Sequence, residues 1–235
     1  MLLNAKPLIS CVIPFWNEGS RLYAVLDEVS KTKNIFEVIC VDDASYENNS
    51  DEIRKHYPNF KLLRLKKNYG KSGAILEGLK IVKGNLILLL DADIRNLNHN
   101  EIEKAIKIVQ QNPDVDMLIL RRIKAPLFVK LTRGDVLASG ERIVKLNYLM
   151  NVLKNSTKGW ELESKINLFM FNNNKKVYWF PHSGINTHWK WGIKADFKYH
   201  KKKIADIYSI GFTNLLKLFL FFGKEEVKYQ KNLRI

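Results

Sequence analysis

The segment Asn85-Leu-Ile-Leu-Leu-Leu-Asp-Ala-Asp93 predicts the fold class of this chain. Its apolar run, from Leu86 to Leu90, lacks polar alternation, which is typical of a strand buried on both faces of a parallel sheet. In open α/β sheets, ligands bind in the crevice beyond the carboxyl ends of such strands. The two carboxylates that follow, with no Cys or His beside them, suit a hard divalent cation such as Mg²⁺ or Mn²⁺. A surface turn after a core strand is the structural alternative for this Asp-x-Asp on its own.

Outward from this strand, strand-like runs alternate with segments of helical spacing. This alternation predicts an α/β fold with a mostly parallel, Rossmann-like sheet and helices on both faces. We expect the first strand to stop at Pro14. The predicted strands are residues 8–13, 36–41, 60–65 and 115–120, and the predicted helices are residues 19–31, 47–56 and 101–111 and one that ends near residue 82.

The composition narrows the range of partners and compartments. The 235 residues include 39 Lys and Arg against 24 Asp and Glu, a net charge of +15, which favours anionic partners. No long basic arm is present, so we expect no nucleic-acid partner. Cys11 and Cys40 lie in apolar runs and are expected in the core. Neither a signal peptide nor an apolar run of membrane-spanning length is evident, and we expect a cytoplasmic location.

Polar groups follow two strands, with a Gly-Lys turn between them in the sequence. Asp42 and Asp43 end one strand, Asp91 and Asp93 end the other, and Lys71 lies near a predicted helix N-terminus. Carboxylates can bind a base, a ribose or a metal, while a Lys and backbone amides can hold phosphate. These are the parts of a nucleotide-diphosphate site. The first turn has no Gly-x-Gly-x-x-Gly, which argues against a nicotinamide or flavin site.

Four motifs together carry a family resemblance. They are Ile13-Pro-Phe-Trp-Asn-Glu18, Val41-Asp-Asp-Ala-Ser45, Asn68-Tyr-Gly-Lys-Ser-Gly-Ala74 and Asp91-Ala-Asp93. In this order they resemble family 2 glycosyltransferases of the GT-A fold, nearest the branch of dolichyl-phosphate mannose synthases. The resemblance covers about residues 8–190. It departs from the usual pattern at Phe15, where a small residue is usual, and at Ala44, where Gly is usual.

The resemblance implies a role for each matching residue. Asp42 or Asp43 would contact the base, and Lys71 would lie near the diphosphate. Asp91 and Asp93 would face the ribose and the metal, with Asp93 the surer ligand. The structural alternatives are a helix cap for Asn17 and Glu18 and a solvated side chain for Lys71. The full set implied for the nucleotide site is Pro14, Asn17, Glu18, Asp42, Asp43, Asn68, Lys71 and Asp91.

The second half of the chain is less regular. We interpret residues 121–140, rich in Arg and Lys, as a flexible acceptor loop, with a plain surface excursion as the alternative. The resemblance places Ser139-Gly-Glu-Arg142 after that loop, and we expect it to begin a helix through about residue 153. It also makes Glu163 the acid near the acceptor, either a base or a positioning group, with Glu161 the close alternative. A purely structural Glu163 is the other alternative. The resemblance also makes His188, rather than His182, a candidate third metal ligand, with a satisfied surface or core histidine as the structural alternative.

Residues 211–235 form a separate apolar and basic tail after a domain of residues 1–210. Residues 212–222 are too short to span a bilayer but have helical, strongly apolar character. Three interpretations stay open: the segment packs on the domain, packs on a second subunit in a homodimer, or lies on an anionic membrane surface.

The resemblance implies an inverting, metal-dependent glycosyltransferase. Its donor would be a UDP- or GDP-linked sugar, its acceptor a polyprenyl phosphate, a glycan or another small molecule, and its place the cytoplasm, at the inner face of the membrane. Two alternatives stay open. One is a protein that binds a nucleotide sugar without turnover. The other is a sugar-phosphate nucleotidyltransferase, which would want a Gly-rich loop after the first strand that residues 14–18 do not offer.

Overall fold

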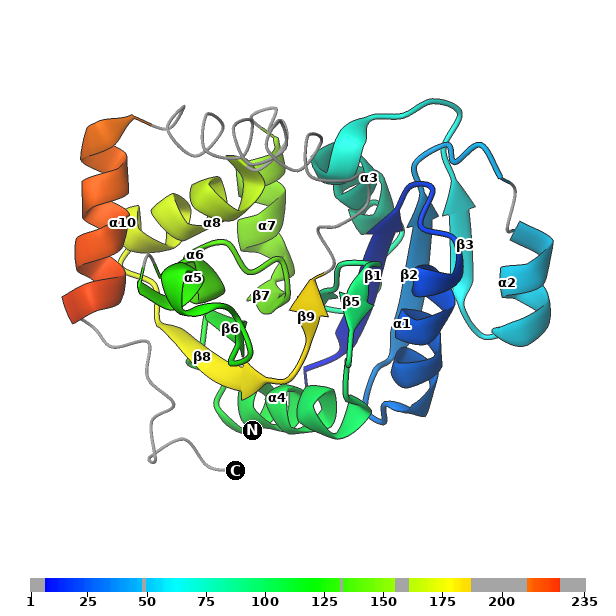
Figure 1. Ribbon diagram of the computed structural model, residues 1–235, viewed down its shortest axis with the longest axis horizontal. Helices are drawn as coiled ribbons and strands as arrows, with labels where there is room; N and C mark the ends of the chain where they lie inside the picture. Colours follow the sequence, from blue (N-terminus) through cyan, green and yellow to red (C-terminus); the bar gives the residue numbers. More distant parts are fainter. Residues whose placement is uncertain (1–6, 48–49, 132, 155–160, 187–210, 225–235) are drawn as a thin grey trace, which may run out of the picture.

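A central sheet with helices on both faces organises the molecule (Figure 1). The computed structural model describes residues 7–47, 50–131, 133–154, 161–186 and 211–224. The sheet has seven strands in the order β3-β2-β1-β4-β7-β6-β8, and a second sheet pairs β5 with β9. All neighbours in the large sheet are parallel except β7, which is antiparallel to both β4 and β6. The predicted mostly parallel α/β fold is therefore confirmed.

The helices and strands have the following bounds. The first part of the described chain contains β1 (Ile9–Phe15), α1 (Ser20–Lys31), β2 (Glu37–Asp42), α2 (Ser50–His56), β3 (Lys61–Arg64), α3 (Gly70–Leu79), β4 (Leu86–Leu89), β5 (Ile94–Arg95) and α4 (His99–Gln111). The second part contains β6 (Met117–Arg122), α5 (Leu127–Leu131), α6 (Gly134–Leu137), β7 (Arg142–Lys145), α7 (Leu146–Leu153), α8 (Glu161–Asn172), β8 (Val177–His182), β9 (Ile185–Asn186) and α10 (Phe212–Lys224).

The prediction that Pro14 stops the first strand is wrong. β1 continues to Phe15, and Pro14 is in register with Val41 of β2. Val12 accepts a hydrogen bond from Leu90 N, so the even-numbered residues of β1 turn their backbone groups toward β4. Pairing with β4 ends at Val12, which means that the missing N–H of Pro14 faces no ladder partner.

The predicted helix from residue 139 is also wrong in its first part. Arg142 begins strand β7, which lies between β4 and β6, and helix α7 begins only at Leu146. The β-branched Ile143 and Val144 are buried in this strand, and β-branched side chains fit a sheet better than a helix. The preceding excursion, predicted as a loop, contains the short helices α5 and α6.

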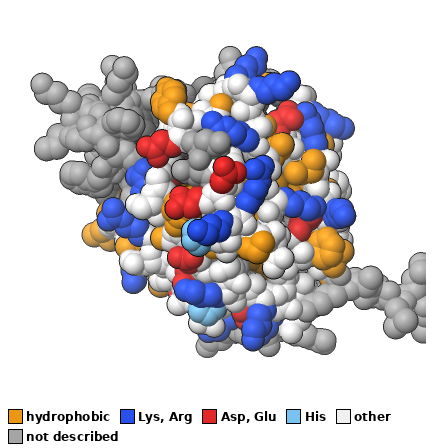
Figure 2. Space-filling view, turned by 90° about the vertical axis from the view of Figure 1, so that its right-hand side faces the viewer, with side chains coloured by type: hydrophobic (Ala, Val, Ile, Leu, Met, Phe, Trp, Pro, Cys, Tyr) orange, Lys and Arg blue, Asp and Glu red, His pale blue; other side chains and the backbone are white. Residues whose placement is uncertain are grey.

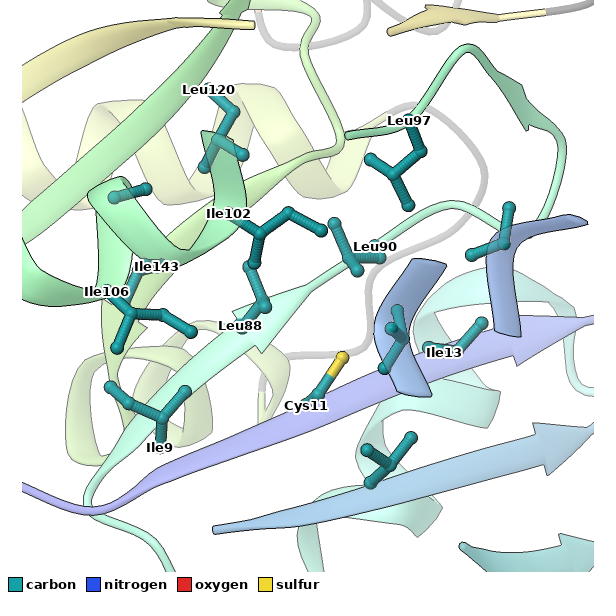
Figure 3. Packing of buried hydrophobic residues seen from close by; sticks show 14 of the residues in the cluster. Ile9, Cys11, Ile13, Leu88, Leu90, Leu97, Ile102, Ile106, Leu120 and Ile143 are labelled. Atoms are coloured by element: carbon teal, nitrogen blue, oxygen red, sulfur yellow. The ribbon is translucent and has the colours of Figure 1, made fainter. Parts of the chain in front are cut away.

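Each face of the sheet has its own core, because successive strand residues point to opposite sides. On one face, Ile9, Cys11 and Ile13 of β1 meet Leu88 of β4 and Ile102 of α4 (Figure 3). Val12, Ile87 and Leu89 point to the other face, which is covered mainly by α3, α7 and α8. Both cysteines are free and buried, as expected from their apolar surroundings.

Helix α10 packs against α8. Its buried residue Leu218 belongs to the core on the sheet face to which Val12, Ile87 and Leu89 point. None of the described helices is long and apolar enough to cross a membrane. The division into residues 1–210 and 211–235 stays a prediction.

Candidate functional site

The turn after β1 is tied to the turn after β2 at the carboxyl edge of the sheet. Asn17 adopts a left-handed φ of 53°, and its backbone N donates to Ser45 Oγ at 2.9 Å. Its side-chain Oδ1 accepts from Tyr46 N at 2.8 Å. The Asn17 side chain therefore binds the neighbouring turn and does not cap α1, whose cap residue is Gly19. Glu18 forms an ion pair with Arg21 at 3.1 Å.

Asp42 and Asp43 differ in what they can offer a ligand. Both oxygens of buried Asp42 are engaged, Oδ1 with Ser45 N at 2.8 Å and Oδ2 with Arg64 Nη1 at 2.9 Å. Asp43 Oδ1 accepts from Tyr69 N at 2.7 Å, which ties β2 to the start of α3. Burial raises the pKa of the Asp43 carboxyl, with the nearby Asp42 charge acting in the same direction. Asp43 is thus the better candidate for a base contact.

The turn before α3 is closed by Asn68. Its Oδ1 accepts from Gly70 N at 3.1 Å, and its Nδ2 donates to the Asp43 carbonyl at 3.3 Å. Gly70 has a φ of +74°, a conformation that Gly adopts without the steric cost of a Cβ. The arrangement places Lys71 in the first turn of α3.

Lys71 lies between two carboxylates that come from distant parts of the chain. Its Nζ is 2.6 Å from Asp91 Oδ1 and 2.8 Å from Glu163 Oε1. Burial alone would lower the pKa of Lys71, but the two carboxylates outweigh it and raise that pKa. Burial likewise works to raise the pKa of Asp91, but the Lys71 charge and hydrogen bond hold it below its usual range. Lys71 is therefore an ion-paired group and not a solvated surface lysine.

Gly140 closes over this ion pair. A Cβ at Gly140 would lie 2.5 Å from Asp91 Oδ2 and 2.8 Å from Lys71 Nζ, closer than real Cβ contacts. Only a residue without a side chain fits there while the ion pair keeps its position. The segment between β6 and β7 consequently reaches the site through its backbone.

A cluster of buried polar residues follows Gly140, formed by Glu141 and Arg142 of the same segment with Arg122, Asn167 and His182. Arg142 Nη1 donates to Asn167 Oδ1 at 3.1 Å, and its Nη2 donates to the Ser139 carbonyl. Burial lowers the pKa of both Arg142 and His182. Within the described residues, several buried polar atoms have no hydrogen-bond partner. They include Arg122 Nε, Glu141 Oε1, Arg142 Nε, Glu163 Oε2 and His182 Nε2.

The carboxylates present fit a divalent cation that arrives together with a diphosphate. Mg²⁺ is usually bound by one or two protein carboxylates and completed by substrate phosphates and water. Asp91 and the partly exposed Asp93 are such a pair, two residues apart. Among the residues that the structure describes, no group of three His, Cys, Asp or Glu side chains gathers as a self-sufficient metal cage. His188, the predicted third ligand, lies outside the described residues.

The structure brings most of the predicted site residues to one edge of the sheet. Pro14, Asn17, Asp43 and Asn68 lie at the ends of β1 and β2 and at the turn before α3. Asp91 and Glu163 meet at Lys71. Of the alternative acid Glu161, only its place at the start of α8 is described. The predicted roles of all these residues stay predictions.

The residues that sequence reasoning missed are in the second half of the sheet. Arg122 of β6 and Asn167 of α8 carry no recognisable sequence signal, because the fold brings them to Arg142 of β7 from distant positions. The one usable signal was Gly140 within Ser139-Gly-Glu-Arg142, which marks a close backbone approach.

Comparison with known proteins supplies the family. The model of the family described as "Glycosyl transferase family 2" matches residues 10–197. An undecaprenyl-phosphate 4-deoxy-4-formamido-L-arabinose transferase of Aeromonas hydrophila is 35% identical over 116 residues, which are 46% of this chain and 35% of that protein. The Serratia proteamaculans protein of the same name is 33% identical over 115 residues, with the same coverage. The chain thus spans about a third of the length of these relatives.

Solved structures support the same fold. Glucosyl-3-phosphoglycerate synthase from Mycobacterium tuberculosis, solved with Mn²⁺, UDP and phosphoglyceric acid, superposes with a TM-score of 0.68 at 16% identity. The superposition covers 87% of this chain and 78% of that one. The GT-A fold is therefore confirmed, while the dolichyl-phosphate mannose synthase branch stays a prediction. The family model matches well over half of the length of this chain, and the chain therefore belongs to glycosyl transferase family 2.

Proposed function

We propose that this protein transfers a sugar from a nucleotide-diphosphate donor to a lipid-phosphate acceptor, with inversion at the anomeric carbon and with a divalent metal. One observation supports the proposal most: Lys71 joins Asp91, which follows β4, to Glu163 of α8 at the carboxyl edge of the sheet. Relatives named for undecaprenyl phosphate support the acceptor class, and the UDP and Mn²⁺ of the structural neighbour support the donor and metal classes.

The donor would lie across the turns that follow β1, β2 and β4. Asp43 would accept a hydrogen bond from the base, beside the Asn17 turn and the buried Pro14. Asp91 would face the ribose, and Asp93 with Asp91 would hold the metal. A bound metal would offset charge on the leaving diphosphate, as Lys71 would from the other side.

In the transfer, an acceptor oxygen attacks the anomeric carbon from the face opposite the diphosphate. The bond from that carbon to the diphosphate oxygen breaks, and the nucleoside diphosphate leaves with the electron pair. A hydroxyl acceptor needs a base for its proton, whereas an ionised phosphate monoester needs none. For a lipid-phosphate acceptor, Glu163 would therefore act mainly by positioning, held in place by Lys71.

We also propose a cytoplasmic location, at the inner face of the membrane. The buried free thiols of Cys11 and Cys40 are compatible with a reducing compartment. A lipid-phosphate acceptor would bring the protein to the bilayer.

The test is release of nucleoside diphosphate from a panel of UDP- and GDP-linked sugars, with polyprenyl phosphate and Mg²⁺ or Mn²⁺ present. We expect release that requires both the acceptor and the metal, and a product whose anomeric configuration is opposite to that of the donor. Donor binding without release would indicate a binding protein. Formation of pyrophosphate from a sugar phosphate and a nucleoside triphosphate would indicate a nucleotidyltransferase.

A further inference from the structure

Helix α10 carries a second apolar face that points away from the protein. Phe212, Leu216, Phe219 and Leu220 follow the spacing of one helix face and are 74%, 49%, 53% and 48% exposed. We call these four residues the outer stripe. Leu218, which is 3% exposed, lies on the opposite side of the helix, where α10 packs against α8. Packing on the domain thus accounts for Leu218 and leaves the outer stripe uncovered.

Helix α5 exposes a matching pair of leucines. Leu127 and Leu131 are one helical turn apart and are 72% and 71% exposed. Helix α5 packs on α6, and both α6 and α10 pack on α8. The two helices therefore lie in the same part of the molecule, the left-hand part of Figure 1. The opposite end, shown in Figure 2, has its hydrophobic side chains scattered among Lys, Arg, Asp and Glu.

The segment that carries α5 leads directly to the candidate site. Arg122 Nη2 donates to the carbonyls of Gly134 and Ala138, at 3.4 and 3.2 Å, which fixes this segment to β6. Arg121 adds an ion pair with Asp135 at 2.5 Å. The segment then ends at Gly140, over Asp91 and Lys71. A lipid-linked phosphate that approached along α5 would be near the ion pair that joins the two halves of the site.

The positive charge of the molecule favours an anionic membrane surface as the partner of these apolar faces. The chain carries a net charge of +15. Lys217 beside the outer stripe and Lys124 before α5 are exposed. Apolar side chains flanked by lysines are the composition that binds an anionic bilayer surface, with the rings and leucines below the headgroups and the lysines among them.

We propose that the outer stripe and the pair Leu127 and Leu131 dock on the surface of an anionic membrane, with the candidate site beside the docked face. The proposal rests on the proposed function, since it names the surface from which a lipid-phosphate acceptor would be reached. It differs from a general attraction of a basic protein to anionic lipid, because it assigns the contact to named apolar residues.

The experiment is co-sedimentation of the full chain with vesicles of phosphatidylcholine, alone or mixed with phosphatidylglycerol. We expect binding to the mixed vesicles, weaker binding to the neutral ones, and weakening by salt, which screens exposed charges over about 10 Å at 0.1 M. The variant carrying Leu216→Ser and Phe219→Ser should lose roughly tenfold or more in vesicle affinity. The variant carrying Leu127→Ser and Leu131→Ser should lose affinity as well.

The matched control carries Phe36→Ser and Ile81→Ser, one aromatic and one aliphatic residue that are 51% and 41% exposed outside the two faces. We expect its vesicle affinity to equal that of the wild type. We call the variant with Leu216→Ser and Phe219→Ser the stripe variant. Equal vesicle affinity of the stripe variant and the wild type, or no vesicle binding of the wild type, would overturn the proposal. A dimer in light scattering that the stripe variant converts to monomer, with vesicle binding unchanged, would assign the stripe to a second copy instead.

Release of nucleoside diphosphate separates this proposal from the proposed function. With a short-chain, water-soluble isoprenyl phosphate and no vesicles, the stripe variant should match the wild type. With a vesicle-embedded polyprenyl phosphate it should be slower. Vesicle binding without turnover on any lipid phosphate would leave docking supported and contradict the proposed acceptor.

Discussion

The two halves of the sheet handle charge in different ways. In the half formed by β1 to β4, charged side chains stand at strand ends, where backbone N–H groups and side chains both hold them, as Tyr69 N holds Asp43 and Arg64 holds Asp42. In the half formed by β6 to β8, charged side chains are buried and hold one another or their neighbours, as Arg142 holds Asn167. The first pattern leaves carboxylates at the edge where a nucleotide would bind. The second fixes the backbone of the segment that reaches the site. Lys71 connects the two halves, because it forms ion pairs with Asp91 of the first half and with Glu163 of α8, which packs on the second.

The largest expected effect tests the carboxylate edge of the first half. Asp93→Ala should lower metal-dependent release of nucleoside diphosphate by about a hundredfold or more, because it would remove the ligand on which the proposed metal site mainly depends. The fold should survive, since Asp93 is partly exposed and follows β4. Turnover and thermal melting are to be measured together. Asp51→Ala, at a carboxylate whose side chain is 93% exposed, is the control, and it should change neither. Unchanged turnover in Asp93→Ala would remove the metal assignment.

The next effect breaks the junction between the halves. Lys71→Met removes the cation that Asp91 and Glu163 share and should cost about 3 kcal/mol of unfolding free energy, since both carboxylates lose their hydrogen-bonded cation and Glu163 is buried. Urea denaturation at neutral pH measures this loss. Lys71→Arg, which keeps the charge, should cost less. Equal losses for both variants would indicate that steric fit, not charge, matters at this position.

The same junction predicts a pH dependence of stability. The pKa of Asp91 is lowered in the folded wild type, so its contribution is fully present above its unfolded value of about 3.9 and is lost as the pH falls through the lower folded pKa. In Lys71→Met, burial should outweigh the remaining charges of Arg122 and Arg142 and raise the pKa of Asp91 above its unfolded value. The stability of this variant should then fall as the pH rises from about 4 to 7. Parallel stability curves for the two proteins would contradict the assignment.

A smaller effect separates the two adjacent acids at the end of β2. Asp43→Ala should weaken binding of free nucleoside diphosphate by about ten- to a hundredfold, or 1.5–3 kcal/mol, through loss of a charged hydrogen bond. Asp42→Ala should act mainly on stability, since both Asp42 oxygens already hold the turn and Arg64. Calorimetry of binding and melting curves for the two variants test this division. Equal affinity of Asp43→Ala and the wild type for the nucleoside diphosphate would mean that the nucleobase does not bind at Asp43.

The smallest effect concerns the departure of this chain from the family pattern at Ala44. Its φ is +59°, a left-handed conformation that strains any residue with a Cβ. Ala44→Gly should therefore stabilise the fold by about 0.5–1 kcal/mol, the relief being partly offset by the greater freedom of Gly in the unfolded chain. Ala24→Gly, in the exposed face of helix α1, is the control and should destabilise by about 1 kcal/mol.

The two halves of the sheet also differ in how far the sequence could predict them. The first half follows a regular β-α-β order, and its acids stand next to apolar runs, so strand ends and site residues could be read together. In the second half, strand β7 is hard to recognise from the sequence, because the charged residues Glu141 and Arg142 at its start suggest a surface position. Both are in fact fully buried. Their partners come from other elements, such as Asn167 on α8, and local patterns carry no information about such pairings. Pro14 could not be placed in a strand from the sequence either. A proline is acceptable there only because β4 offers no hydrogen-bond partner at that position, and this depends on the pairing of the two strands.

The measurement that tests the junction most directly is a double-mutant cycle in the transfer reaction. It compares kcat/KM for nucleoside diphosphate release in wild type, Lys71→Met, Glu163→Gln and the double variant. If Lys71 acts on the acceptor side through Glu163, the effects should be strongly non-additive, and the double variant should be little worse than the more impaired single one. If the two losses multiply, the residues act independently, and the account of a site joined through Lys71 is contradicted.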